Sequence, residues 1–152
     1  MNQIRNRVYN LIFLLILIST FLIPTCSGTV FLKDGTEIPR DEVRNFMMNN
    51  SIYKTDSPFP IQFFYSSNCG SCKDALKFLQ SYERKNPSTR IEYRNLVYNG
   101  ENRQLFTEYK NQFRHPKISY PAVFIGNIGI TGSSDIIHTT DQVVKGYQNQ
   151  LY

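Results

Sequence analysis

The part of this sequence most suited to chemistry is a pair of cysteines separated by two residues. The pair forms the motif Cys69-Gly70-Ser71-Cys72. Cysteines at this spacing serve zinc sites, haem attachment and dithiol–disulfide exchange. Lys73 follows the motif where haem attachment requires a histidine, so haem is disfavoured. The motif alone therefore leaves three alternatives: a zinc site, a redox pair and an inert structural disulfide.

Further metal ligands are scarce in this chain. A zinc site built by one chain would need two ligands besides the cysteine pair. The sequence contains three cysteines and two histidines, and the third cysteine, Cys26, lies near the N-terminus. The histidines, His115 and His138, do not form a spaced pair and fit surface or capping positions better. We therefore expect no metal, with one alternative, a zinc ion shared between the cysteine pairs of two chains.

A buried strand and a helix are expected on either side of the motif. Ile61–Tyr65 is a nearly continuous apolar and aromatic run, which is typical of a strand buried on both faces. Apolar residues then recur at helical spacing as far as Asn86. A cysteine at the start of such a helix is exposed, and the free N–H groups and the helix dipole stabilise its thiolate. This position predicts that Cys69 attacks and that Cys72, inside the first turn, resolves the mixed disulfide.

The remaining elements alternate between strands and helices. Strands are expected at 29–33, 61–65, 90–98, 121–126 and 128–131, with turns at Asn99-Gly100 and Gly126-Asn127. Helices are expected at 39–50, from the motif to Asn86, around 105–113, and at the C-terminus with Thr140 as its N-cap. This order predicts an α/β sandwich in which helices flank a mixed central sheet.

At this level the chain resembles the thioredoxin superfamily, from about Phe59 to Tyr152. Besides the cysteine motif, the resemblance rests on Ser119-Tyr120-Pro121 entering a strand. It implies a thioredoxin-like three-layer sandwich and a cis Tyr120–Pro121 peptide bond that faces the cysteines. It further implies a substrate groove formed by Tyr120, Pro121, Gly70 and Ser71, in which the backbone of Tyr120 pairs with an extended substrate segment.

Two departures from that family concern the chemistry of the site. Thioredoxins hold a buried aspartate in the strand before the motif as a proton acceptor, and Phe63 occupies the corresponding position here. Cys72 must therefore lose its proton to water, to substrate or to another group. Gly132 and Asp135 resemble the residues with which glutaredoxins hold glutathione, so glutathione is a candidate ligand. We expect no other cofactor.

The N-terminal 28 residues are expected to be a targeting segment. Arg5 and Arg7 precede an apolar run from Val8 to Ile23, and small residues follow as far as Gly28. The run of about 16 residues is shorter than the ~20 that span a bilayer. A cleaved signal peptide is therefore favoured over a membrane anchor. Lipidation at the nearby third cysteine is a further alternative.

The remaining chain, 29–152, is expected to be one extracytoplasmic domain. The length of 152 residues and 19% charged residues exclude a large two-lobed enzyme and a disordered polyelectrolyte. The net charge is +5, but the basic residues are interspersed with acids, so we expect no nucleic-acid partner.

These patterns together predict an exported thiol–disulfide oxidoreductase. Its substrates would be cysteine-containing exported or membrane proteins, and a membrane thiol reductase or a quinone-linked oxidase would be its redox partner. The direction of electron transfer is left open by the sequence. The alternative is a non-catalytic domain of the same fold in which Cys69 and Cys72 form a fixed structural disulfide.

Overall fold

The computed structural model describes residues 28–50 and 60–149. Along the chain it contains β1 (Thr29–Leu32), β2 (Glu37–Ile38), the 3₁₀ turn η2 (Arg40–Glu42), α2 (Val43–Asn49), β3 (Ile61–Tyr65), α3 (Gly70–Lys85), β4 (Ile91–Asn95), α4 (Gly100–Gln112), β5 (Ala122–Ile125), β6 (Ile128–Thr131) and α5 (Ser133–Asn149). The α/β class predicted from the sequence is confirmed. The expected targeting segment, apart from Gly28, lies outside the described residues.

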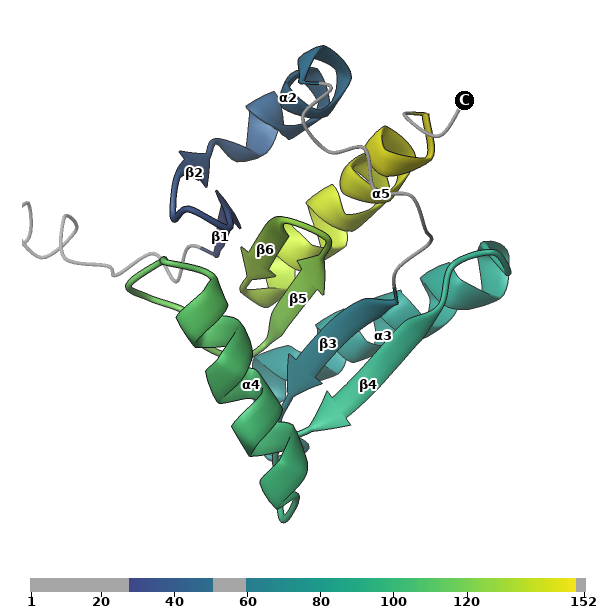
Figure 1. Cartoon of the computed structure of the whole chain (residues 1–152). Helices are drawn as coiled ribbons and strands as arrows, with labels where there is room; N and C mark the ends of the chain where they lie inside the picture. Colours follow the sequence, from purple (N-terminus) through teal and green to yellow (C-terminus); the bar gives the residue numbers. More distant parts are fainter. Residues whose placement is uncertain (1–27, 51–59, 150–152) are drawn as a thin grey trace, which may run out of the picture.

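The strands form one mixed six-stranded sheet in the order β2-β1-β6-β5-β3-β4 (Figure 1). β3 and β4 are parallel, and the other neighbours are antiparallel. A parallel pair needs a long crossover, which α3 supplies between β3 and β4. β5 and β6 are joined by the expected hairpin turn, in which Gly126 has a φ of +54°. The mixed sheet predicted from the sequence is thus confirmed.

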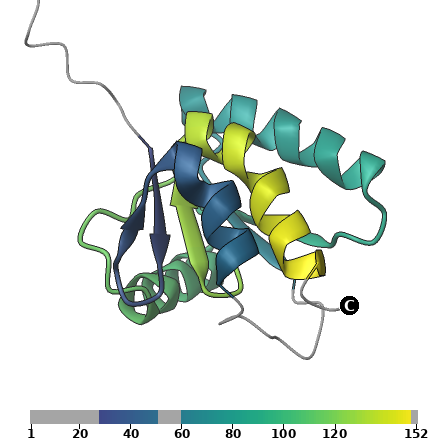
Figure 2. The same ribbon diagram turned by 90° about the horizontal axis from the view of Figure 1, so that it is seen from above.

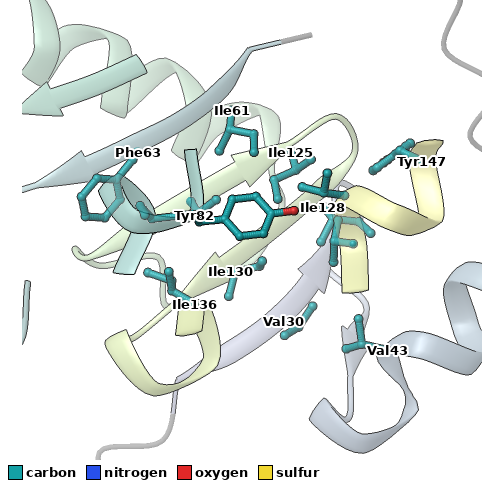
Figure 3. Close-up of a cluster of buried hydrophobic side chains, with 14 of the residues drawn as sticks. Val30, Val43, Ile61, Phe63, Tyr82, Ile125, Ile128, Ile130, Ile136 and Tyr147 are labelled. Carbon is teal, nitrogen blue, oxygen red and sulfur yellow. The ribbon is translucent and has the colours of Figure 1, made fainter. Parts of the chain in front are cut away.

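Helices cover both faces of this sheet. Figure 2 shows α2, α3 and α5 on one side and α4 on the other. Successive strand residues point to opposite faces, so Phe63 of β3 packs with the three-helix side and Phe64 with α4. The larger core, on the three-helix side, is mainly aliphatic, with Ile61, Ile125 and Ile130 among its members (Figure 3). The helices thereby hold β3, and the loop that follows it, from both sides.

The C-terminal helix begins earlier than its sequence pattern suggested. α5 starts at Ser133, and Thr140, expected to be its N-cap, is a buried residue within it. The Thr140 hydroxyl donates a hydrogen bond to the carbonyl oxygen of Ile136, 2.6 Å away. A threonine can satisfy its hydroxyl in this way inside a helix, which removes its preference for a cap. Gly132, with a φ of +82°, makes the turn from β6 into α5 instead.

The connection between β4 and α4 also differs from expectation. The strand expected to reach Tyr98 ends at Asn95. Asn99 and Gly100, expected to form a turn, are the N-cap and the first residue of α4. The Asn99 side chain accepts a backbone hydrogen bond from the first helical turn, the usual role of asparagine at this position. Within the described ranges, no helix is both long and apolar enough to cross a membrane.

Candidate functional site

Cys69 and Cys72 form a disulfide where β3 leads into α3. Their Cα atoms are 5.3 Å apart. Cys69 is the N-cap residue of α3 and is half-buried, whereas Cys72 is only 1% exposed. Gly70 and Ser71 are exposed in the first turn of the helix. One sulfur of the pair is therefore open to an incoming thiol, and the other lies in the interior.

Two hydrogen-bond donors point at the sulfur of Cys69. The backbone N–H of Cys72 and the hydroxyl of Ser71 each lie 3.2 Å from Cys69 Sγ. A disulfide sulfur carries no proton, so the hydroxyl must be the donor. Both donors, together with the start of α3, would stabilise negative charge on this sulfur once the disulfide is reduced. The geometry supports Cys69 as the reactive thiol of the pair.

Ser71 is expected to tune that reactivity. In reduced protein, Ser71→Ala should raise the pH at which Cys69 alkylation by iodoacetamide reaches half its maximal rate by roughly 0.5–1 unit, because one donor to the thiolate is lost. Ser71→Thr keeps the hydroxyl and should retain the wild-type midpoint. The measurement is the alkylation rate against pH. Coincident midpoints for the alanine and threonine variants would show that the hydroxyl does not stabilise the thiolate.

Tyr120 and Pro121 lie at the same end of the sheet as the cysteine loop, which comprises residues 66–69. β5 pairs antiparallel with β3, with Ala122 opposite Phe64. The same register, continued, brings Pro121 opposite Tyr65 and Tyr120 opposite Ser66, the first residue of the cysteine loop. The Tyr120–Pro121 bond is cis, as the resemblance implied. Tyr120 is 48% exposed and Pro121 is buried, so the tyrosine is the one available for contact.

Two surface hollows flank the cysteine loop. The first, called here the Arg103 groove, has a volume of about 360 Å³ and is lined chiefly by Ser66, Leu96, Val97, Arg103, Phe106 and Tyr120. The second, the Cys72 hollow, has a volume of about 270 Å³ and is lined chiefly by Tyr65, Ser66, Ser67, Cys72, Lys73 and Asn95. Ser66 lines both, and its carbonyl accepts the Cys69 N–H at 3.1 Å. Neither Ser66 nor Arg103 was singled out from sequence, since a lone serine or an arginine on a helix carries no functional pattern.

Among residues 28–50 and 60–149, the interior next to the pair shows no proton acceptor of the thioredoxin kind. Phe63 is fully buried, with its ring stacked 5.1 Å from that of Tyr65. No carboxylate lines the Cys72 hollow in the described part of the chain. The wall of this hollow is mostly apolar, and its polar groups, Ser67 and Asn95 among them, would hold water near Cys72.

Asp135, a candidate glutathione ligand, is already engaged within the chain. Its side chain is 3% exposed and forms an ion pair with Arg40. Gly132, the other candidate, lies close to Pro121, since its N–H donates to the Pro121 carbonyl at 2.9 Å. The structure thus brings both residues to the cysteine end of the sheet, but the Asp135 carboxylate would have to leave Arg40 to bind a ligand.

His115 is not a surface residue, contrary to expectation. It is 7% exposed, and its ring stacks on Phe31 at 4.4 Å. Its Nδ1 accepts the N–H of Lys117 at 3.3 Å, so Nε2 carries the proton donated to Glu37 Oε1 at 2.9 Å. Glu37 belongs to β2, a strand that the sequence did not predict. His115 therefore ties β2 to the segment before Tyr120.

His138 stays on the surface, where its Nδ1 donates to the Ser134 carbonyl within α5 at 2.6 Å. Across residues 28–50 and 60–149, histidine, cysteine and carboxylate side chains form no cluster of three that could hold a metal ion.

Two tyrosines with raised pKa values, Tyr82 and Tyr93, lie away from the cysteine pair. Burial raises the pKa of Tyr82 to about 12, and Asp141, which accepts a hydrogen bond from the Tyr82 hydroxyl, adds to the shift. Burial likewise raises the pKa of Tyr93, whose hydroxyl donates to Glu83. Neither tyrosine lines either hollow. These shifts reflect the contacts of α3 with its neighbours and give no acid–base pair at the site.

No protein-family model, curated protein or solved structure matches this chain at a significant level.

Proposed function

We propose that this protein is an exported thiol–disulfide oxidoreductase with a thioredoxin-like three-layer fold. The observation that carries the proposal is the asymmetry of the cysteine pair. Cys69 is half-buried at a helix N-terminus and accepts two hydrogen bonds on its sulfur, while its partner Cys72 is buried in the first turn of the same helix. A dithiol needs this asymmetry to direct attack to one sulfur and resolution to the other.

The reaction transfers two electrons in two exchange steps. When the pair is reduced, the Cys69 thiolate attacks one sulfur of a substrate disulfide, and the second substrate sulfur leaves as a thiolate that takes up a proton. Cys72, after losing its proton, then attacks Cys69 Sγ. The mixed disulfide breaks, the Cys69–Cys72 disulfide forms, and the first substrate sulfur is released as a thiol. Oxidation of a substrate dithiol follows the same steps in reverse.

The fold supports this proposal through the placement of β5. In a thioredoxin-like arrangement the cis-proline segment stands beside the cysteine motif, and the strand register here brings Tyr120 and Pro121 to the cysteine loop. Exposed Tyr120 would pair through its backbone with an extended substrate segment. With the targeting segment at 1–28, substrates would be cysteine-containing exported or membrane proteins, and a membrane redox partner would recycle the pair.

The rival function is a binding domain with a fixed Cys69–Cys72 disulfide. Phe63 favours this rival, because it replaces the buried base that assists resolution in thioredoxins. The reduction potential separates the two, since structural disulfides lie below about −300 mV whereas exchange-active pairs lie at roughly −270 to −120 mV.

The decisive test is the capture of a mixed disulfide. Full-length Cys72→Ser protein, mixed with insulin as a disulfide substrate, should accumulate a covalent adduct through Cys69 that dithiothreitol dissolves. The wild-type protein should turn over without accumulating it, because Cys72 releases the substrate, and Cys69→Ser should form none. The readout is a non-reducing gel with mass spectrometry of the adduct. A lack of adduct, together with a wild-type disulfide of potential below about −300 mV, would establish the structural-disulfide rival instead.

A further inference from the structure

The Arg103 groove carries one positive charge that no carboxylate among the described residues neutralises. Arg103 contributes the groove's one charged side chain, as far as the described residues show. One guanidinium nitrogen donates to the Leu96 carbonyl at 3.1 Å, which holds the side chain against the groove wall. Within residues 28–50 and 60–149, no carboxylate forms an ion pair with it. The guanidinium has five N–H donors, so one backbone contact leaves several for a ligand.

The groove adjoins the cysteine loop through Ser66. Its wall includes Ser66, whose carbonyl holds the Cys69 backbone, and Tyr120, which is expected to pair with substrate. A substrate whose cysteine reaches Cys69 would therefore extend its neighbouring residues into the groove. Because an extended chain advances only about 3.3 Å per residue, we expect the groove to receive side chains within about two or three residues of the substrate cysteine.

Exposed aromatic rings at this end of the molecule favour a protein occupant. Of the large apolar side chains exposed in the described structure, Tyr98 at 96% and Tyr120 at 48% both lie here. Tyr98 directly follows Val97, a groove residue, and holds a left-handed backbone conformation with φ of +57°. Exposed tyrosines and arginines are typical anchors of protein contacts.

We propose that the Arg103 groove binds the segment next to the reactive cysteine of a protein substrate and that Arg103 selects an acidic side chain in that segment. This inference rests on the proposed function and adds a substrate class to it, namely cysteines flanked by aspartate or glutamate. The positive wall attracts a carboxylate and repels a lysine, while the apolar walls, which include Leu96 and Phe106, accept neighbouring aliphatic groups.

A kinetic test uses short peptides that carry one cysteine activated as a 2-pyridyl disulfide. The thiolate of Cys69, in reduced Cys72→Ser protein, attacks the peptide sulfur. The Cys69–peptide disulfide forms, the bond to the pyridyl sulfur breaks, and the released pyridine-2-thiolate takes up a proton to give 2-thiopyridone, which absorbs light. The peptides differ only in having Glu, Gln or Lys at one of the positions on either side of the cysteine, so the neutral leaving group is common to all.

Glutamate peptides should react faster than lysine peptides at one or more of these positions, by about three- to tenfold at low salt, as expected for attraction and repulsion at a partly exposed charge. Glutamine peptides should react at an intermediate rate. The ratio should approach one at 1 M salt, where the screening length is about 3 Å. Arg103→Gln should abolish the preference and Arg103→Lys should keep most of it. Lys73→Gln, which removes the cation on the opposite side of the cysteine loop, is the matched control and should keep the preference.

Equal rates for all peptides, a preference that survives Arg103→Gln, or one that disappears in Lys73→Gln would each overturn the role of Arg103. In each of these three outcomes Cys69 still reacts with the peptides, so the proposed exchange reaction stands. If instead no peptide reacts faster with Cys72→Ser than with the Cys72→Ser/Cys69→Ser double variant, the proposed function fails, and this inference fails with it.

Discussion

Iodoacetamide at neutral pH is expected to alkylate Cys69 of the reduced protein roughly a hundred times faster than Cys72, because cysteine reactivity follows thiolate character and exposure. Cys69 is half-buried, with two donors to its sulfur, whereas Cys72 is 1% exposed and has no carboxylate in the adjoining hollow among the described residues. Peptide mapping by mass spectrometry over a time course measures the two rates.

The unfolded protein is the control for this selectivity. In concentrated guanidinium chloride the two cysteines should react at similar rates, since burial and hydrogen bonding are lost. Selectivity confined to the folded state would assign attack to Cys69 and resolution to Cys72. Similar rates in the folded protein would mean that the pair is symmetric in solution, and the assignment of roles would then be wrong.

Arg40→Ala is expected to lower the free energy of unfolding by about 3 kcal/mol, because it leaves the buried Asp135 carboxylate without its partner. Asp135 is 3% exposed, and its ion pair with Arg40 joins the N-terminus of α5 to η2. The effect is large for a solvent-facing residue because the cost arises at the buried carboxylate. Urea denaturation of the full chain measures the difference.

Two further variants distinguish the loss of this ion pair from the loss of any surface positive charge, as causes of lower stability. Arg44→Ala removes an exposed arginine from the same region of the chain and should change stability by no more than about 0.5 kcal/mol. The double variant Arg40→Ala/Asp135→Asn removes the buried charge as well and should be more stable than Arg40→Ala alone. Equal losses for Arg40→Ala and Arg44→Ala would show that the ion pair contributes little to folding.

The elements next to the cysteine pair could be predicted because their patterns are local. The apolar run 61–65 is the observed β3, and the helical spacing after the motif is the observed α3. The hairpin at Gly126 was also encoded locally, by a turn residue between two apolar strands. In each case the residues that form the element are neighbours in sequence, so periodicity and turn chemistry suffice.

The errors arose where distant contacts outweigh local preference. Thr140 has the chemistry of a helix cap, but α5 buries it and satisfies its hydroxyl internally. His115 lies in a loop, but stacking on Phe31 and pairing with Glu37 remove it from the surface. Glu37 could be placed only through β2, a two-residue strand that exists by pairing with β1. Such short strands carry no periodic signal of their own.

By itself the sequence determined which residues the candidate site contains: two cysteines separated by two residues, placed between a buried strand and a helix start. Only the tertiary structure decided what surrounds them. The pairing of β5 with β3 brings Tyr120 to the cysteine loop, and the position of α4 adds Arg103 to the same groove. Strand register and helix packing join residues far apart in the chain, and no local pattern encodes them.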